Sequence, residues 1–375
     1  MMKRTFLTLV AATALLTANA QEIKLPSWIN NVKLSGYGMT QFQANFKDEA
    51  KTNTFQLRLV RASLEGRIAK DWYWKFQLQF NGNTADLGSS PRMVDMFAEW
   101  QKYEYFKVKV GQFKRPFTYE NPMNPINQGF FSYAQNVLKL SGFSDRDGSH
   151  ASNGRDIGVQ IQGDFLKNAA GRNLLHYQVG VFNGQGINVK DFDQQKDLIG
   201  GIWVMPVKGM RLGAFGWTGS YARTGNTDAD DPQNTATRTK RLQKRRYAIS
   251  GEYVVDGWTF RSEYIHSTGY GFKNTYKNES TAKDLTVNTA AGDKADGFYA
   301  LAIAPIVKGK LEGKLRYDLY RARADWDTSK AYYEAGFNYY FNKNVQLNAE
   351  YLYVNERSLA KPNYSMVDVQ LDFKF

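Results

Sequence analysis

Apolar and polar residues alternate along most of the chain. In WYWKFQLQF (residues 72–80), apolar side chains occupy every even position, and Lys75, Gln77 and Gln79 occupy odd positions. The same period of two returns in RYAISGEYVVD (246–256) and in many later stretches. A period of two over about ten residues is typical of a β-strand with one apolar and one polar face.

Sixteen such segments follow one another from Val32 to the last residue, Phe375. Short and long connections between them take turns. The short ones are 70–71, 102–104, 208–209, 256–257, 308–310 and 342–344. The long ones are 82–91, 115–154, 184–197, 223–245 and 271–295. This pattern predicts an all-β fold, a sixteen-stranded antiparallel outer-membrane β-barrel with short periplasmic turns and long outer loops. A soluble β-sandwich is the alternative, but sandwiches do not sort their loops in this way.

In such a barrel the polar face lines the lumen and the apolar face contacts lipid. Because every backbone group inside the bilayer needs a partner, the last strand must pair with the first. The chain ends in MVDVQLDFKF (366–375), which alternates to its last residue. We therefore expect this segment to close the barrel against VKLSGYGM (32–39), with Phe373 and Phe375 near the inner membrane–water interface.

The N-terminus has the pattern of a secretory signal peptide. A positive Lys3-Arg4 pair precedes an apolar run over Phe6–Leu16, and Ala18-Asn19-Ala20 supplies a cleavage site. The apolar run is too short to span a bilayer. We predict cleavage after Ala20 and export to the bacterial outer membrane. The expected mature chain has a short periplasmic segment over residues 21–31 and the barrel over residues 32–375.

The composition excludes several classes of protein. Lys and Arg number 49 against 36 Asp and Glu, for a net charge of +13, and cysteine is absent. The histidines, His150, His176 and His266, have no Cys or carboxylate at the spacing of metal ligands. Nucleotide-binding loops, hydrolase motifs and dinucleotide fingerprints are also missing. We expect no enzyme activity, no metal and no cofactor. The basic excess points to anions or anionic lipid, because an exported chain without a recognition motif does not suit nucleic acid.

Three stretches are distinctive: GQFKRPFTYENP (111–122), RDIGVQIQGDF (155–165) and YQVGVFNGQG (177–186). They resemble segments of the phosphate-selective porin O/porin P family. With FQLRLVRASLEGRIAKDWYWKFQ (55–77), the likeness extends over most of the mature chain. The resemblance implies a sixteen-stranded barrel, usually trimeric, that admits anions across the outer membrane. The terminal Phe375 also resembles the signal that the bacterial outer-membrane assembly machinery reads.

The resemblance further implies that the long loop after GQFK folds into the barrel and narrows it. Here that loop covers residues 115–154, and GFFSYAQNVLKLSG (129–142) within it is expected to form a short helix. Gly129 and Gly142 would allow the tight turns that such a fold needs. The motif residues at the start of this constriction loop are Lys114, Arg115, Pro116, Phe117 and Glu120.

The phase of each strand assigns charged residues to the lumen. The candidate anion-binding residues on the first five strands are Arg58, Arg61, Arg67, Lys75, Lys107 and Lys109. Placing Arg61 and Arg67 inward requires a β-bulge, because the alternation changes phase near Val60. By this assignment the first five strands sum to +4 and the other eleven to −5. This predicts a basic wall that faces an acidic one. Such a wall would pass anions by charge-assisted contacts, or its charges would only solvate a wide channel.

A further basic cluster, RTKRLQKRR (238–246), follows the acidic TDADD (227–231). We place it on a long outer loop. There it would gather anions or grip lipopolysaccharide phosphates, or it would simply be solvated and pair with its own acidic neighbours.

These observations favour a passive outer-membrane porin for small anions of the phosphate type. The alternative within transport is a general diffusion porin for small hydrophilic solutes or sugars. A barrel enzyme would need a catalytic set at one rim, which the sequence lacks. An adhesin barrel would be smaller, whereas sixteen strands leave an aqueous channel. The expected partners are small anions, outer-membrane lipid and lipopolysaccharide, the assembly machinery and two further copies of the chain.

Overall fold

The computed structural model describes residues 28–81, 91–146, 151–226, 236–273 and 284–375. The strands of the first half are β1 (Ile29–Asn45), β2 (Thr52–Ile68), β3 (Trp72–Gln79), β4 (Arg92–Trp100), β5 (Lys107–Lys114), β6 (Arg155–Lys167), β7 (Asn173–Phe182) and β8 (Asp197–Val204). The strands of the second half are β9 (Met210–Asn226), β10 (Thr237–Val255), β11 (Trp258–Thr268), β12 (Lys294–Val307), β13 (Leu311–Arg321), β14 (Ser329–Asn342), β15 (Val345–Glu356) and β16 (Asn363–Lys374). The described helices are α2 (Gln135–Leu140) and the single 3-10 turns η1 (Pro125–Asn127) and η3 (Trp326–Thr328).

The strands form one closed barrel in which each strand pairs with its neighbours in sequence, and β16 pairs with β1. Neighbouring strands are antiparallel throughout. The predicted sixteen-stranded antiparallel barrel is therefore confirmed. The first strand begins at Ile29, slightly before the expected start. The predicted signal peptide, residues 1–20, lies outside the described residues.

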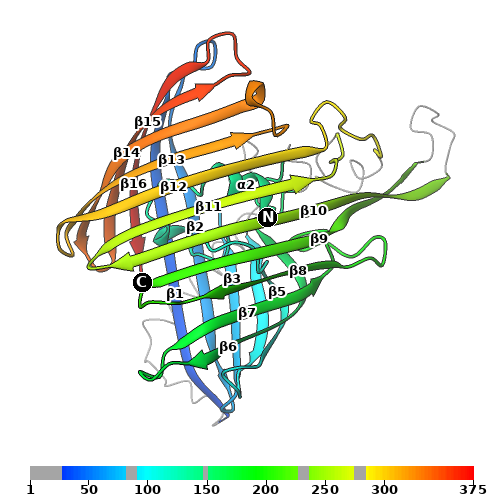
Figure 1. The fold of residues 1–375 in the computed structure, drawn as a ribbon, viewed down its shortest axis with the longest axis vertical. Helices are drawn as coiled ribbons and strands as arrows, with labels where there is room; N and C mark the ends of the chain where they lie inside the picture. Colours follow the sequence, from blue (N-terminus) through cyan, green and yellow to red (C-terminus); the bar gives the residue numbers. More distant parts are fainter. Residues whose placement is uncertain (1–27, 82–90, 147–150, 227–235, 274–283) are drawn as a thin grey trace, which may run out of the picture.

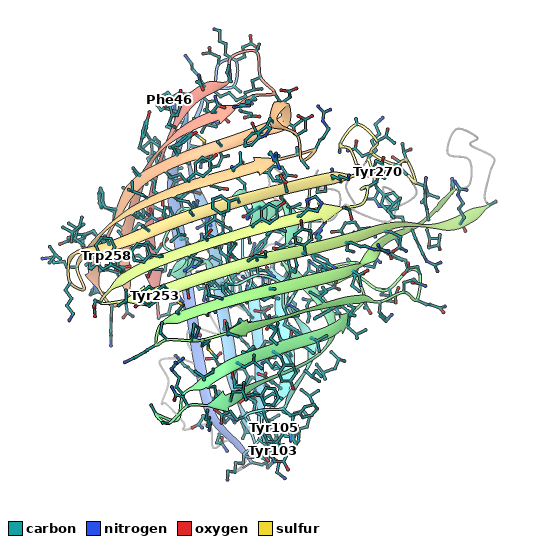
Figure 2. The ribbon with its side chains drawn as sticks, in the orientation of Figure 1. Phe46, Tyr103, Tyr105, Tyr253, Trp258 and Tyr270 are labelled. Carbon is teal, nitrogen blue, oxygen red and sulfur yellow. The ribbon has the colours of Figure 1, made fainter. Side chains whose placement is uncertain are left out.

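The strands alternate between a polar interior and an apolar exterior. On β10, Tyr247 and Ile249 are 49% and 61% exposed, whereas Ala248 and Ser250 between and beyond them are buried. This is the inverse of a soluble protein and suits contact with lipid. Exposed aromatic residues gather at the two ends of the strands; Figure 2 shows Trp258 and Tyr103 at one end and Tyr270 at the other. Within the described residues, no helix is long and apolar enough to cross a membrane.

The seam between β1 and β16 is closed by the last residue of the chain. The backbone groups of Gly36 and Phe375 exchange two hydrogen bonds of 3.0 Å. A Cβ on Gly36 would lie 2.4 Å from the ring of Phe375, and a Cβ on Gly38 would lie 2.3 Å from the ring of Phe373. The terminal rings thus cover the two glycines. The partner segment of β16 is Gly36–Asn45, so it overlaps only the second half of the expected VKLSGYGM.

The basic cluster RTKRLQKRR belongs to β10 and not to a loop, so its predicted position is wrong. The β9–β10 ladder continues up to the pair Asn226–Thr237, and its alternation sorts the cluster between the two faces. Lys244 points inward and pairs with Asp197 at 2.8 Å, and Arg246 pairs with Asp145 at 2.7 Å. Pairing with β9 decides this arrangement, and the composition of the cluster alone does not reveal it.

Candidate functional site

The longest connection, residues 115–154, lies against the inside of the barrel in its described part. Its helix α2 packs on β11, β12 and β13, and Figure 1 shows it behind the front wall. The ring of Phe117 lies edge-on to Trp217, with centroids 5.6 Å apart, and Tyr119 lies edge-on to Phe215 at 5.4 Å. The expected short helix within GFFSYAQNVLKLSG is confirmed as α2.

The turns of this loop depend on glycine. Gly129 and Gly142 have φ angles of +94° and +84°, which other residues rarely adopt. A Cβ on Gly142 would also lie 2.3 Å from a guanidinium nitrogen of Arg115. The predicted role of these two glycines in tight turns therefore agrees with the backbone geometry.

Carboxylates on the inner wall hold the backbone of the loop. Glu263 of β11 accepts the N–H groups of Tyr119 and Glu120 at 2.8 and 2.9 Å. Asp318 of β13 accepts the N–H of Gln135 at 2.9 Å, and Glu350 of β15 accepts the N–H of Phe131 at 2.7 Å. The loop thus satisfies its backbone donors with the charges of the predicted acidic wall.

The cations of the same wall also bind its carboxylates and the loop. Arg316 makes two hydrogen bonds of 2.9 Å to Glu334 and donates to the carbonyl of Ser132 in the loop. Lys314 donates to Glu350 and to the carbonyl of Gly129 at 2.5 and 2.8 Å. The predicted acidic wall therefore does not face the basic wall across open water, because the loop lies on it.

A cavity of about 220 Å³ remains between the loop and the opposite wall. The loop contributes the segment Pro122–Pro125, and Tyr37, Tyr73, Phe97 and Phe113 supply aromatic surface. The charged lining residues are five basic ones and a single acid: Arg61, Lys75, Lys109, Lys114, Arg155 and Asp95. This cavity in the barrel interior is thus strongly basic.

Three of these cations have their donors occupied. Arg155 pairs with Asp95 at 2.6 Å, and Arg61 donates to Gln79 and Tyr37. Lys114 donates to three oxygens of the loop at 2.6–2.8 Å, those of the carbonyls of Asn121 and Met123 and of the Tyr133 hydroxyl. Burial raises the pKa of Tyr133, so this phenol stays neutral.

The ammonium groups of Lys75 and Lys109 differ from these three cations in their distance to a partner. Lys75 lies 3.9 Å from Glu65 and Lys109 lies 3.9 Å from Glu99, beyond hydrogen-bonding distance. Their side chains are 24% and 17% exposed, although Lys109 also sits over the rings of Phe97 and Phe113. These two ammonium groups offer hydrogen-bond donors to a solute in the cavity.

The structure brings together Arg61, Lys75 and Lys109 of the six predicted wall residues. The other three lie outside the cavity lining. Arg58 donates to Gln370, Arg67 donates to Gln101 near a turn, and Lys107 pairs with Asp164 at 3.3 Å. The predicted β-bulge is present at Arg58, where the register with β1 skips one residue of β2.

The loop-motif residues are buried, apart from Lys114, which lines the cavity. Arg115 pairs with Asp156 at 2.9 Å, and both side chains are at most 1% exposed. Pro116 and Phe117 are buried beside it, and Glu120 accepts the N–H of Ala134 at 3.1 Å. These four residues fix the root and the fold of the loop and do not contact the lumen.

Sequence reasoning did not select Arg155 or Asp95 as anion-site residues. Alternation along β6 assigns Arg155 to the outer face, because Val159 on the same phase is exposed. Its side chain nevertheless points inward, where Asp95 of β4 binds it from across β5 and Gln77 of β3 accepts a further hydrogen bond. A contact between strands that are not adjacent leaves no signal in the period of one strand.

Comparisons with known proteins agree with this geometry. Residues 34–196 match the model of a family described as phosphate-selective porin O and P. A search of curated proteins found no match.

Many solved structures share the fold. An anion-selective porin from Comamonas acidovorans is 13% identical with a TM-score of 0.61, covering 92% of this chain and 99% of that one. The outer membrane channel DcaP of Acinetobacter baumannii is 12% identical with a TM-score of 0.59, covering 94% and 99%. OmpF of Salmonella typhi is 13% identical with a TM-score of 0.58, covering 92% and 97%.

Proposed function

We propose that this chain, an outer-membrane porin whose residues 34–196 match the family of phosphate-selective porins O and P, passes small anions of the phosphate type. The basic cavity carries this proposal. It lies beside the loop and combines five cations with one carboxylate. A porin is a channel and not an enzyme, and the proposed pathway needs only diffusion through water.

The exposed donors of Lys75 and Lys109 suit passage of an anion better than tight binding. Lys75 lies on β3 and Lys109 on β5, so a solute meets two separate ammonium groups and no deep chelating site. Selective conduction needs contacts that favour entry and still allow release. Arg61, Arg155 and Lys114 add positive potential, while their own donors hold the wall and the loop in place.

The reversal potential in a salt gradient tests this proposal. The double variant Lys75→Gln/Lys109→Gln should move the reversal potential toward cations. It should also weaken phosphate block of the chloride current about tenfold, because losing charge-assisted contacts worth about 1.4 kcal/mol corresponds to that factor. Arg211→Gln is the matched control: its side chain is 28% exposed on the far wall and already pairs with Glu252 at 3.0 Å.

The control separates the two candidate functions. A shift per charge that is much smaller in Arg211→Gln than in the double variant supports the basic wall as the anion pathway. Equal small shifts per charge would overturn it and leave a general diffusion porin for small hydrophilic solutes or sugars.

We also propose that three copies of the chain assemble. Strands β3, β4 and β5 have only 8, 9 and 8 residues. At about 3.3 Å per residue and a tilt of about 40°, such strands cover about 20 Å, less than the apolar band of about 25 Å. Their outer face carries an apolar groove of about 740 Å³ lined by residues such as Trp74, Met96 and Val110. A neighbouring copy would cover this thin side.

The mass of the detergent complex tests the trimer. The protein should measure as three chains, and Val110→Arg should shift it toward single barrels, because an unpaired charge in an apolar interface is costly. A wild-type protein that measures as one chain would contradict the proposal.

Two further assignments concern biogenesis. Cleavage after Ala20 follows from the signal-peptide pattern, and the N-terminal sequence of the purified protein should begin at Gln21. The assembly machinery would read Phe375, so deleting this residue should reduce the heat-modifiable folded band in membranes.

A further inference from the structure

Two exposed cations lie in register on the outer face of the barrel. Arg245 of β10 is paired in register with Thr268 of β11, which is paired with Lys294 of β12. Residues directly opposite on antiparallel strands share a face. This face is the outer one, because Tyr247 and Ile249 follow Arg245 at every second position and are exposed. Adjacent strands are about 4.8 Å apart, so the backbones of Arg245 and Lys294 are about 10 Å apart.

These cations sit at the outer boundary of the apolar band. Strand β11 begins at the exposed Trp258 and ends at Thr268, and it is 11 residues long. A tilted strand of this length covers about 25 Å, the height of the band. Figure 2 shows Trp258 at one end of the wall and Tyr270, two residues beyond Thr268, at the other. The outer end of β11, with Arg245 and Lys294 on either side of it, therefore lies at the depth of outer-leaflet headgroups.

Aromatic and paired groups fill the next row toward the membrane. Tyr247 stacks on His266 with ring centroids 5.3 Å apart. The carboxylate of this row, Asp296, is held by Arg321 at 2.7 Å, so a partner already offsets its negative charge. Among the ion pairs of the described residues, none involves Arg245 or Lys294.

An apolar groove begins two rows below the cations, at Ile249, Tyr264 and Phe298. It has a volume of about 760 Å³ and lies on the outer face of β8–β12. Small residues, Ala214, Gly251 and Ser262, line its floor. Its larger lining residues are Ile202, Val204, Leu212, Ile249, Tyr264 and Phe298. Cations above an apolar groove are complementary to an amphiphile with an anionic head.

We propose that this face binds a phosphorylated glycolipid of the outer leaflet, with a phosphate between Arg245 and Lys294 and an acyl chain in the groove. Thr268 lies between the two cations, and its hydroxyl would turn to the same phosphate from its long 3.4 Å contact with the carbonyl oxygen of Arg245. The proposal rests on the outer-membrane location and not on the selectivity of the pore. It divides the basic cluster between two roles: Arg245 faces lipid, while Lys244 and Arg246 stabilise the interior.

Native mass spectrometry of the detergent-solubilised full chain tests this site, with bisphosphorylated lipid A as the probe. Arg245→Gln/Lys294→Gln should reduce retention of the lipid at least tenfold. The matched control Lys208→Gln/Lys308→Gln removes two exposed charges from periplasmic turns and should change it less than twofold. A heat-modifiable band shows that each variant is folded. Equal retention in the folded double variant and the control would overturn the proposal.

Two further arms identify the source of the phosphate and the part played by the groove. Dephosphorylated lipid A should bind the unsubstituted protein at least tenfold more weakly, and millimolar inorganic phosphate should not displace the intact lipid. Displacement by free phosphate would overturn the lipid assignment in favour of a phosphate site. Ala214→Trp fills the groove and should also weaken retention severalfold; full retention would contradict the placement of the acyl chain.

Discussion

The two sides of the barrel interior use the same charged residue types for different purposes. On the side that carries the loop, Lys314 and Glu350 are both fully buried. They form an ion pair with each other and hydrogen bonds with the loop backbone. On the opposite side, Lys75 and Lys109 keep 24% and 17% of their side chains exposed. The difference shows that the sign of its charges alone does not make a wall available to a solute. What packs against a charged residue decides whether it binds protein or solute.

The largest effect is expected from removing the loop. Deleting residues 128–145 should raise the single-channel conductance about two- to fivefold, because the wider lumen then limits the current. The barrel should still assemble, since β1–β16 do not depend on the deleted residues for their ladder. An unchanged conductance would contradict a loop that narrows the pore.

The next comparison makes the same substitution on each side. Lys314→Met should lower the free energy of unfolding by about 3–5 kcal/mol, because it leaves Glu350 buried without its cation. Lys75→Met should cost about 0–1 kcal/mol, because its pair is long and partly exposed. Denaturant unfolding in lipid vesicles measures both. Similar losses would show that the two sides do not differ in the way described.

A smaller effect is expected from the single acid of the cavity. Asp95→Asn should move the reversal potential further toward anions, since it removes one negative charge and leaves Arg155 without its ion pair. The shift should be smaller than that of the double lysine variant and opposite in sign. A shift toward cations would mean that Arg155 had left the cavity and that Asp95 positions the wall.

The smallest effect is expected outside the cavity. Arg67→Gln and Lys107→Gln should leave the reversal potential within experimental error, because these residues bind Gln101 and Asp164 and do not line the cavity. A shift as large as that of Lys75→Gln, measured in the same bilayers, would extend the pathway along the whole wall.

Some of the site was predictable because alternation is a local property. The phase of β3 and β5 assigns Lys75 and Lys109 to the lumen, and both line the cavity. Arg61 needed one further inference, the bulge in β2, which the structure confirms at Arg58. The height of a residue in the pore is not local, so Arg67 and Lys107 could not be separated from the others.

The basic cluster on β10 shows a different limit. In the sequence, its six cations indicate a solvated loop. A strand that extends beyond the membrane has no apolar face, and the apolar face is what identifies a strand in the sequence. Hydrogen bonding to β9 and carboxylates such as Asp197 and Asp145 turn Lys244 and Arg246 into interior residues. Those carboxylates are about 50 to 100 residues away in the chain.

The sequence by itself determined the closed barrel, since a period of two with sorted connections has one solution in a bilayer that satisfies every backbone group. It also determined that the last of the alternating segments must pair with the first. Only the tertiary structure decided which charges remain available to a solute. That choice depends on where the long loop settles, and the loop settles where Glu263, Asp318 and Glu350 can accept its backbone N–H groups. Hydrogen bonds between residues this far apart in the chain depend on closure of the barrel, which brings them within reach.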